Sequence, residues 1–382
     1  MNPIYDLIIV GAGPTGLATA IEAQRHHLNY AVIEKGCITN SIFHFPNQMV
    51  FFTTPELLEI GGMPLVSERE KPTRNEALKY YRKVASALHL NVHQYEEVQR
   101  IQKLAFNAGP TVRPTGGTPA EPASLIRPSD GPPTSFNAGP TVRPAGGTPA
   151  EPASLIRPSD GPPTSRHFRV VTSRTEYETR NVVIAIGYYD NPNLLGIPGE
   201  DLPHVSHYYT EPYAFYNRDV VVVGGKNSAA EAALDLFRGG ARVTLVHRGS
   251  EMGSTVKYWV RPDIENRFKV REIAAFFNAR VVEINAASVQ ILQAETIRSI
   301  PAQQVFLLTG YHSSTTLFQQ LGVRFDPNTL RPEFDPQTFE TNVPGVYLAG
   351  SVVGGRQNAE VFIENGRFHG ELVVRTIADQ VS

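Results

Sequence analysis

The 382-residue chain has little of several features that would define a function on their own. Its single cysteine, Cys37, excludes an intrachain disulfide and a thiolate metal cluster, and its histidines lack the spacing of metal ligands. The 35 Lys and Arg residues nearly balance the 37 Asp and Glu residues, so the net charge of -2 indicates no nucleic-acid partner. The first apolar run, residues 7–10, is much shorter than the about 20 residues of a membrane span, and it lacks the basic start of a secretory signal. We therefore expect a cytoplasmic protein with no metal and no membrane partner.

Residues 106–165 differ from the rest of the chain in composition. Segments 106–135 and 136–165 are a tandem duplication, and the two copies differ only at Thr115 and Ala145. Each copy is rich in Pro, Gly, Ser and Thr and poor in large apolar side chains, so it cannot bury enough surface to offset the entropy of ordering. We predict a disordered insertion in a loop, which a fold tolerates when the loop ends lie close together.

Outside the insertion, segments with the pattern of strands alternate with segments that have the pattern of helices. This alternation is typical of parallel sheets with helices on both faces. The predicted strands are residues 5–10, 30–33, 167–172, 182–186, 219–223, 242–246, 304–308 and 346–348. The predicted helices are residues 17–27, 74–90, 228–238 and 360–378.

A glycine motif joins the first strand to the first helix, with the sequence Gly11-Ala12-Gly13-Pro14-Thr15-Gly16. Gly11 permits a tight turn, Gly13 lets the backbone approach a pyrophosphate, and Gly16 lets the helix pack closely on the strand. The start of the helix offers free N–H groups to the phosphates. Glu34 ends the next strand, 23 residues after Gly11, where a carboxylate would bind the ribose hydroxyls. This arrangement predicts a dinucleotide site.

A second motif, Gly224-Gly225-Lys226-Asn227-Ser228, follows the strand at 219–223. Ala229 stands near the position of the third glycine. The next strand is followed by Arg248 and has no carboxylate at its end, which favours the 2′-phosphate of NADPH, and Lys257 could assist. The alternative is that Arg248 is only a solvated surface charge. Two paired sites indicate an oxidoreductase in which hydride passes from a nicotinamide to a flavin and electrons then reach an acceptor.

Further segments outside the insertion have a distinctive sequence. They are Glu34-Lys35-Gly36-Cys37, Asn40-Ser41-Ile42, Phe51-Phe52, Leu58-Glu59-Ile60-Gly61, Gly187-Tyr188-Tyr189-Asp190-Asn191-Pro192-Asn193, Pro198-Gly199-Glu200-Asp201-Leu202-Pro203, Thr309-Gly310-Tyr311-His312 and the segment from Phe362 to Gly370. On these segments and the second glycine motif, the chain resembles the bacillithiol disulfide reductase family, a branch of the thioredoxin-reductase-like flavoproteins.

The resemblance implies an α/β fold with two nested Rossmann-like dinucleotide-binding domains of the thioredoxin-reductase-like type. The FAD-binding domain would comprise residues 1–105, 166–209 and 312–382, and the NADPH-binding domain residues 210–311. FAD and NADPH are the implied cofactors, a small-molecule disulfide is the implied acceptor, and a homo-oligomer is expected. Further residues expected around the cofactors are Lys35, Asn40, Ser41, Phe52, Gly187, Gly310, Gly350 and Ser351.

The chain departs from the family at the position of its proposed redox cysteine, which directly follows the Gly-Ala-Gly-Pro of the first motif. Thr15 stands there, and a threonine cannot form a mixed disulfide. Thr15 either donates a hydrogen bond to flavin or ligand, or only fills the start of the helix. Cys37 is expected near the adenosine half of FAD, in a packing role. His44 is either a proton donor to the reduced acceptor or a hydrogen-bonded core histidine.

Several functions remain open on the sequence alone. The first is NADPH-dependent reduction of a small disulfide or related acceptor, with electrons passing directly from the flavin. The second is reduction of ferredoxin or another electron carrier, or an NADPH oxidase activity, since neither requires a cysteine. The third is a non-enzymatic flavin redox sensor, in which residues 106–165 would bind a partner.

Overall fold

The structure is a computed structural model that describes residues 4–104, 167–357 and 360–381. The insertion predicted to be disordered, residues 106–165, lies outside the described residues. Its two ends are described. Leu104 donates its N–H to the carbonyl of His167 at 2.8 Å, and Lys103 pairs with Phe168 across two antiparallel strands. The chain thus leaves and re-enters the fold at hydrogen-bonded neighbours, as the tolerance of a long insertion requires.

The first sheet contains the first glycine motif. Its strands in the described chain are β1 (Tyr5–Val10), β2 (Tyr30–Ile33), β3 (Val92–His93), β4 (Val98–Lys103), β5 (Phe168–Thr172), β6 (Glu176–Ile184) and β15 (Val346–Leu348). Strands β3, β2, β1, β6 and β15 run parallel, while β4 and β5 continue the sheet antiparallel from the first half of β6. The predicted strands 5–10, 30–33 and 346–348 are confirmed, whereas β6 starts six residues before the predicted strand 182–186.

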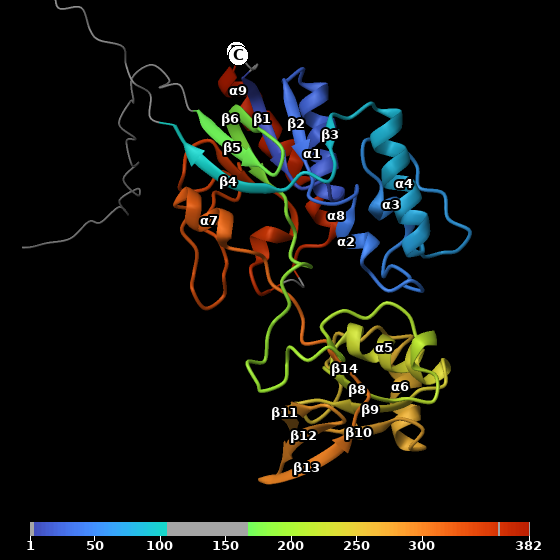
Figure 1. Ribbon diagram of the computed structural model, residues 1–382. Helices are drawn as coiled ribbons and strands as arrows, with labels where there is room; N and C mark the ends of the chain where they lie inside the picture. Colours follow the sequence, from blue (N-terminus) through green and yellow to red (C-terminus); the bar gives the residue numbers. More distant parts are fainter. Residues whose placement is uncertain (1–3, 105–166, 358–359, 382) are drawn as a thin grey trace, which may run out of the picture. The chain divides into compact units, whose positions relative to one another are not determined.

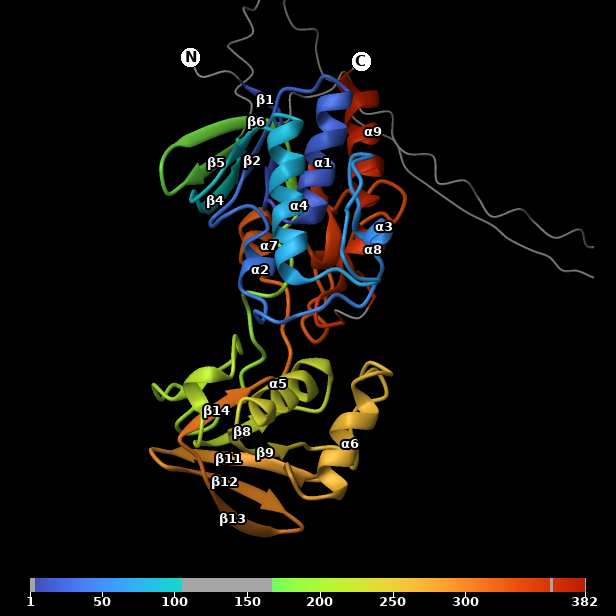
Figure 2. The same ribbon diagram turned by 90° about the vertical axis from the view of Figure 1, so that its right-hand side faces the viewer.

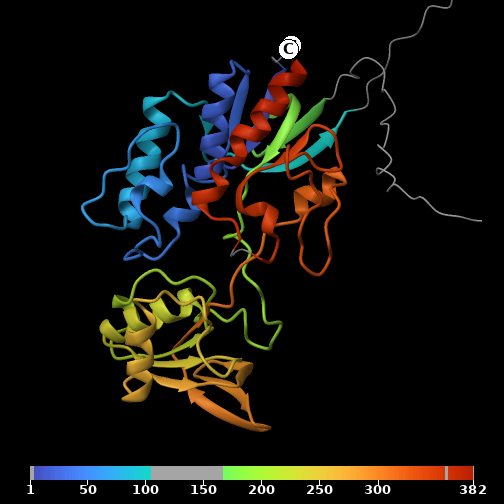
Figure 3. The same ribbon diagram turned by 180° about the vertical axis from the view of Figure 1, so that it is seen from behind.

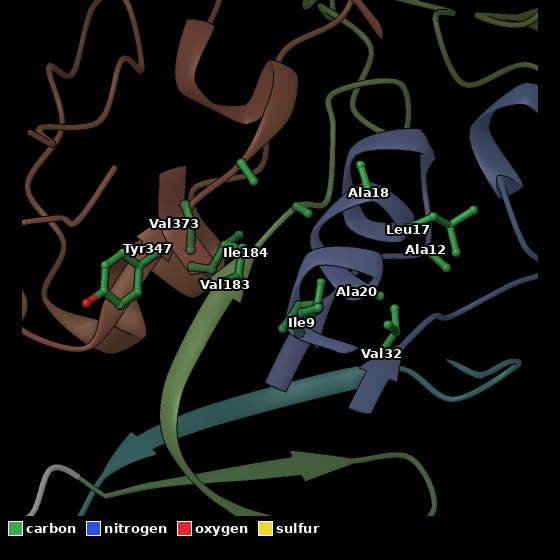
Figure 4. Packing of buried hydrophobic residues seen from close by; sticks show 14 of the residues in the cluster. Ile9, Ala12, Leu17, Ala18, Ala20, Val32, Val183, Ile184, Tyr347 and Val373 are labelled. Carbon is green, nitrogen blue, oxygen red and sulfur yellow. The ribbon is translucent and has the colours of Figure 1, made fainter. Parts of the chain in front are cut away.

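Two helices cover one face of the first sheet. Helix α1 (Pro14–Arg25) and helix α9 (His369–Val381) lie side by side (Figure 2). The fully buried Leu17 of α1 and Val373 of α9 belong to one core with Ile9 and Val183 of the sheet (Figure 4). Each such side chain contributes about 1.5–3 kcal/mol through removal of apolar surface from water. This core fixes α1 on the strands that flank the first motif.

The other described helices that accompany the first sheet are short, except α4 (Arg74–Ala87). They are α2 (Asn40–Phe43), α3 (Pro55–Leu58), α4 (Arg74–Ala87), α7 (Thr316–Leu321), α8 (Ile363–Gly366) and the 3₁₀ helix η2 (Gly350–Gly354). Helix α4 begins with a capping box, in which Thr73 and Glu76 each bond the backbone of the other. None of the described helices is long and apolar enough to cross a membrane.

The prediction of one final helix over residues 360–378 is wrong, because α8 and α9 are separate. Asn365 accepts the N–H of Phe362 through Oδ1 at 2.8 Å, which forms a local turn. Arg367 then donates to the carbonyls of Glu56 and Glu59 at 2.8 and 2.5 Å. These contacts redirect the chain between the two helices.

The second sheet contains the second glycine motif. Its described strands, in the order β10 (Ala274–Phe276), β9 (Arg242–Val246), β8 (Asp219–Val223), β14 (Gln304–Leu307) and β7 (Val205–Ser206), are all parallel. Strand β7 precedes residue 210, the predicted start of the NADPH domain, so this sheet recruits chain from before that boundary. The 3₁₀ helix η1 (Tyr213–Phe215) connects β7 to β8.

The two faces of the second sheet are covered differently (Figure 3). Helices α5 (Asn227–Arg238) and α6 (Arg261–Lys269) pack their buried side chains against one face. On the other face, Val221 and Val305 pack with Val289 and Ile291 of an antiparallel sheet. That sheet consists of β11 (Ala279–Asn285), β12 (Ser288–Gln293) and β13 (Thr296–Pro301). The prediction of helices on both faces is therefore wrong here, since the alternating apolar residues of β12 form a meander that covers one of them.

Candidate functional site

The first glycine loop has the geometry that a bound pyrophosphate requires. Gly11 has φ +106°, and a Cβ atom there would lie 2.7 Å from the carbonyl oxygen of Ala185. A Cβ at Gly16 would lie 1.9 Å from the oxygen of Gly11, so only glycine lets α1 pack on the turn. At Gly13, apart from its two chain neighbours, no atom of the described residues lies within 4 Å of that position, which leaves open space beside the backbone. Gly13 caps the 12-residue α1 with no side-chain hydrogen bond, so no capping side chain takes its first N–H groups.

Glu34 ties the first glycine loop to the end of β2. Its carboxylate accepts the N–H of Ala12 at 2.7 Å and the N–H of Gly36 at 2.8 Å, and the residue is only 7% exposed. Burial raises the pKa of Glu34, and the two backbone hydrogen bonds oppose that rise. Each oxygen keeps capacity for a further donor, so binding of a ribose hydroxyl stays a prediction that this geometry permits.

Thr15 occupies a niche between two glycines. Its Oγ1 lies 2.8 Å from the position of a Cβ at Gly350 and 3.3 Å from that of a Cβ at Gly366, so any side chain at either position would crowd it. Thr15 lines the cavity at the first loop, and its hydroxyl has no hydrogen-bond partner among the described residues. The hydroxyl is therefore available to a ligand in that cavity.

His369 fixes the backbone beside Thr15, and sequence reasoning missed it. Its Nδ1 accepts the N–H of Gly350 at 3.1 Å, and its ring stacks on Phe339 with centroids 4.2 Å apart. Burial lowers the pKa of His369 to about 4, so the ring is neutral at physiological pH. The only signal in the sequence was its place in the family segment that ends at Gly370.

Most residues predicted to bind FAD line the cavity at the first loop. They are Gly11, Gly13, Pro14, Thr15, Glu34, Lys35, Asn40, Ser41, Phe52, Gly187, Gly350 and Ser351. Lys35 pairs with Asp190 at 2.9 Å, and Ser351 Oγ lies 3.8 Å from the Cβ position of Gly187. These contacts bring together segments that are more than 150 residues apart in the chain.

His44, a predicted proton donor, and Cys37, predicted to have a packing role, both lie away from the cavity wall. His44 is exposed and does not line the cavity; its ring packs edge-to-face on the exposed Phe43, and its carbonyl accepts the Tyr189 hydroxyl at 3.1 Å. A buried core position for His44 is therefore wrong. Cys37 is half-buried and also absent from the cavity wall, with Sγ 3.8 Å from Asn40 Oδ1. Burial raises the pKa of the Cys37 thiol, which disfavours the reactive thiolate.

The second glycine loop repeats the arrangement of the first. A Cβ at Gly224 would lie 2.6 Å from the oxygen of Leu308, and one at Gly225 would lie 2.2 Å from the ring of His247. Helix α5 begins at Asn227 with no side-chain cap, while the Asn227 amide ties the loop to Thr255 and Lys257 at 3.0 and 2.8 Å. The second loop lines the same cavity as the first. The residues predicted for NADPH that line it are Gly224, Gly225, Lys226, Asn227, Ser228, Arg248, Lys257 and Gly310.

Arg248 and Lys257 differ in their availability to a phosphate. Arg248 is exposed two residues after β9 and has no carboxylate partner in the described part of the chain. The Lys257 ammonium is 7% exposed and lies 2.6 Å from Glu231 Oε1, which neutralises its charge. The predicted contact with the 2′-phosphate therefore depends on Arg248 rather than on Lys257.

Two strand–glycine loop–helix units of the dinucleotide-binding kind, together with the family match below, define the class: the protein is an FAD- and NADPH-dependent oxidoreductase. Residues 8–118 and 162–350 match the model of the pyridine nucleotide-disulphide oxidoreductase family. The chain is 36% identical over 372 residues to the bacilliredoxin reductase Bdr of Bacillus subtilis (strain 168), with 97% of each chain covered.

Two solved structures are similar over 99% of each chain. They are the bacillithiol disulfide reductase Bdr (YpdA) from Bacillus cereus, with 34% identity and a TM-score of 0.81, and that from Staphylococcus aureus, with 30% identity and a TM-score of 0.81. The chain belongs to the pyridine nucleotide-disulphide oxidoreductase family, and the predicted resemblance to the bacillithiol disulfide reductases is confirmed.

Proposed function

We propose that the protein uses NADPH to reduce a small-molecule disulfide, and that no protein thiol takes part in the transfer. The relatives are named for bacilliredoxin and bacillithiol disulfide, which supports an acceptor of this kind. The observation that supports the thiol-free route is the position of Thr15, which lines the cavity and whose hydroxyl has no partner among the described residues, while the one thiol of the chain, Cys37, does not line it. A mixed disulfide needs a thiolate at the reacting site.

When bound, the two cofactors would supply the redox chemistry, namely hydride transfer between nicotinamide and flavin and electron transfer to the acceptor. The residues of the chain bind and orient them. The N–H groups at the start of α1 would hold the FAD pyrophosphate, Glu34 the ribose, and Arg248 the 2′-phosphate of NADPH. Thr15 would donate its hydroxyl proton in a hydrogen bond to the cofactor or the acceptor. The proposed contacts with the rest of FAD come from Lys35, Asn40, Ser41, Phe52, Gly187, Gly350 and Ser351.

An anaerobic stopped-flow experiment tests the proposal. The purified protein is reduced with NADPH, mixed with bacillithiol disulfide, and followed at the absorption band of the oxidised flavin. Return of the band on the time scale of turnover supports direct reduction of the disulfide. A flavin that stays reduced with the disulfide, yet is reoxidised at once by another acceptor, contradicts it.

A second function is favoured by the same absence of a thiol at the cavity. Reduction of ferredoxin or another electron carrier, or of oxygen, requires no cysteine, so Thr15 is no obstacle. Ferredoxin and oxygen are therefore the two other acceptors in the stopped-flow experiment. Normal turnover after deletion of residues 106–165 would count against a redox sensor that works through that segment. We further infer a cytoplasmic homo-oligomer, and sedimentation of the purified protein tests the oligomer.

A further inference from the structure

Arg74, the first residue of α4, is a buried cation without a carboxylate partner in the described part of the chain. Its guanidinium donates to the carbonyl of Ile42 at 3.1 Å, to the carbonyl of Phe43, and to Asn75 Oδ1 at 3.1 Å. The residue is only 9% exposed. Its backbone N–H donates to the carbonyl of Met49 at 2.9 Å. All these acceptors are neutral and the ring of Phe43 lies 5.6 Å from the guanidinium carbon, so no anionic side chain among the described residues compensates the positive charge.

The segment that Arg74 holds forms one wall of the flavin cavity. Ile42 and Phe43 end the four-residue helix α2, and Asn40, Ser41 and Met49 line the cavity with Ile42. A single helical turn is not stable alone, and its last carbonyls need donors from outside the helix. The side chain of Arg74 donates to the carbonyls of Ile42, which also accepts the Phe45 N–H, and of Phe43, while its backbone N–H binds Met49, so one residue is bonded to both ends of segment 42–49.

The position of Arg74 is unfavourable for α4 itself. A cation at the start of a helix opposes the partial positive charge of the free N–H groups, and the capping box of Thr73 and Glu76 already satisfies this end. A side chain chosen for helix stability would be acidic or neutral. The position is instead suited to the carbonyls of α2 and to a negative charge beyond them.

We propose that Arg74 is a positioning residue of the flavin site, acting in two ways. Its guanidinium fixes segment 42–49 as the cavity wall on which FAD is bound. Its uncompensated charge lies behind that wall and favours the negative charge that the flavin gains on reduction, since a charge in a poorly solvated region is weakly screened. The proposal depends on FAD as cofactor and not on the identity of the acceptor, so it stands or fails separately from disulfide reduction.

Three variants test the proposal: Arg74→Met, Arg74→Lys, and Arg82→Met as the control. Arg82 is an exposed residue of the same helix. The measurements are the dissociation constant of FAD, the midpoint potential of the bound flavin by anaerobic redox titration, and the thermal unfolding temperature of the apoprotein. Arg74→Met removes the charge and the donors, whereas Arg74→Lys keeps the charge and loses the planar fork.

We expect Arg74→Met to weaken FAD binding about tenfold or more, since hydrogen bonds from a charged donor are lost, and to lower the midpoint potential. Arg74→Lys restores the potential and only part of the affinity, and Arg82→Met leaves both unchanged. An Arg74→Met holoprotein with unchanged affinity and potential overturns the proposal. Equal loss of potential in both Arg74 variants overturns the role of the charge. If Arg74→Met does not fold, the Arg74→Lys comparison with wild type decides whether the fork matters for affinity.

Discussion

Acidification should destabilise the first sheet and its helices through one residue, His369. Its folded-state pKa is about 4, against an ordinary value of 6.5, because burial disfavours the charged ring. The neutral ring accepts the Gly350 N–H through Nδ1. Protonation would place an N–H donor against that N–H donor and put a charge into the stack with Phe339.

The direction in which the unfolding free energy changes with pH follows from the number of protons bound in the folded and unfolded states. Between pH 6.5 and 4 the unfolded chain binds a proton at His369 and the folded chain does not, so stability falls as the pH decreases through this window. The contribution is fully present above pH 6.5. At about 1.4 kcal/mol for each pH unit, the loss at pH 4 is about 3 kcal/mol of unfolding free energy.

The variant His369→Asn isolates this effect, because its Oδ1 keeps an acceptor near the position of Nδ1 and does not titrate. Thermal unfolding of both proteins is followed by circular dichroism from pH 7.5 to pH 4. Carboxylates titrate equally in both, so the difference between the two curves reports His369. We expect wild type to lose about 5 °C or more relative to the variant. Parallel curves, or a His369 NMR resonance that titrates near pH 6.5, would refute the reasoning.

Three further substitutions test the cofactor sites. Gly16→Ala should abolish FAD retention, since its Cβ would lie 1.9 Å from the oxygen of Gly11, and the flavin absorbance per purified chain measures this. Arg248→Ala should raise the KM for NADPH about tenfold or more with little change for NADH, as expected for loss of a charge-assisted phosphate contact; equal changes for both cofactors would mean that Arg248 is only a surface charge. Thr15→Val should slow flavin reoxidation by the acceptor if the hydroxyl is used, whereas an unchanged rate and FAD affinity would leave Thr15 as filler at the start of the helix.

The glycine loops were predictable because their steric demands are local to the motif. Only a glycine fits at Gly16 beside the turn at Gly11, and both residues lie within one motif of six residues, so the motif alone predicts the close packing of helix on strand. The strands beside these loops were predictable as well, because short apolar segments alternate with segments that have the pattern of helices. Figure 1 shows the two strand–loop–helix units at β1–α1 and β8–α5, where they were expected.

The missed residues act through backbone groups that are distant in sequence. Arg74 bonds a carbonyl 32 residues away, and His369 accepts an N–H 19 residues away. A sequence motif records side chains, and the partner of Arg74 and of His369 in each of these bonds is a backbone group. The hydrogen bond from the Ala12 N–H to the Glu34 carboxylate could not be predicted for the same reason, since its donor is a backbone group.

The niche around Thr15 connects the fold to the question of the acceptor. Gly350 and Gly366 leave space beside residue 15, so we expect a cysteine, whose thiol is larger than the hydroxyl of threonine but which lacks its methyl group, to fit there. The exchange of cysteine for threonine at this position is therefore a change of chemistry at one side chain rather than a rearrangement of the site. Thr15→Cys should retain FAD affinity and stability, and it should form a mixed disulfide with a small disulfide that mass spectrometry detects. A variant that fails to bind FAD would show instead that the niche is shaped for threonine.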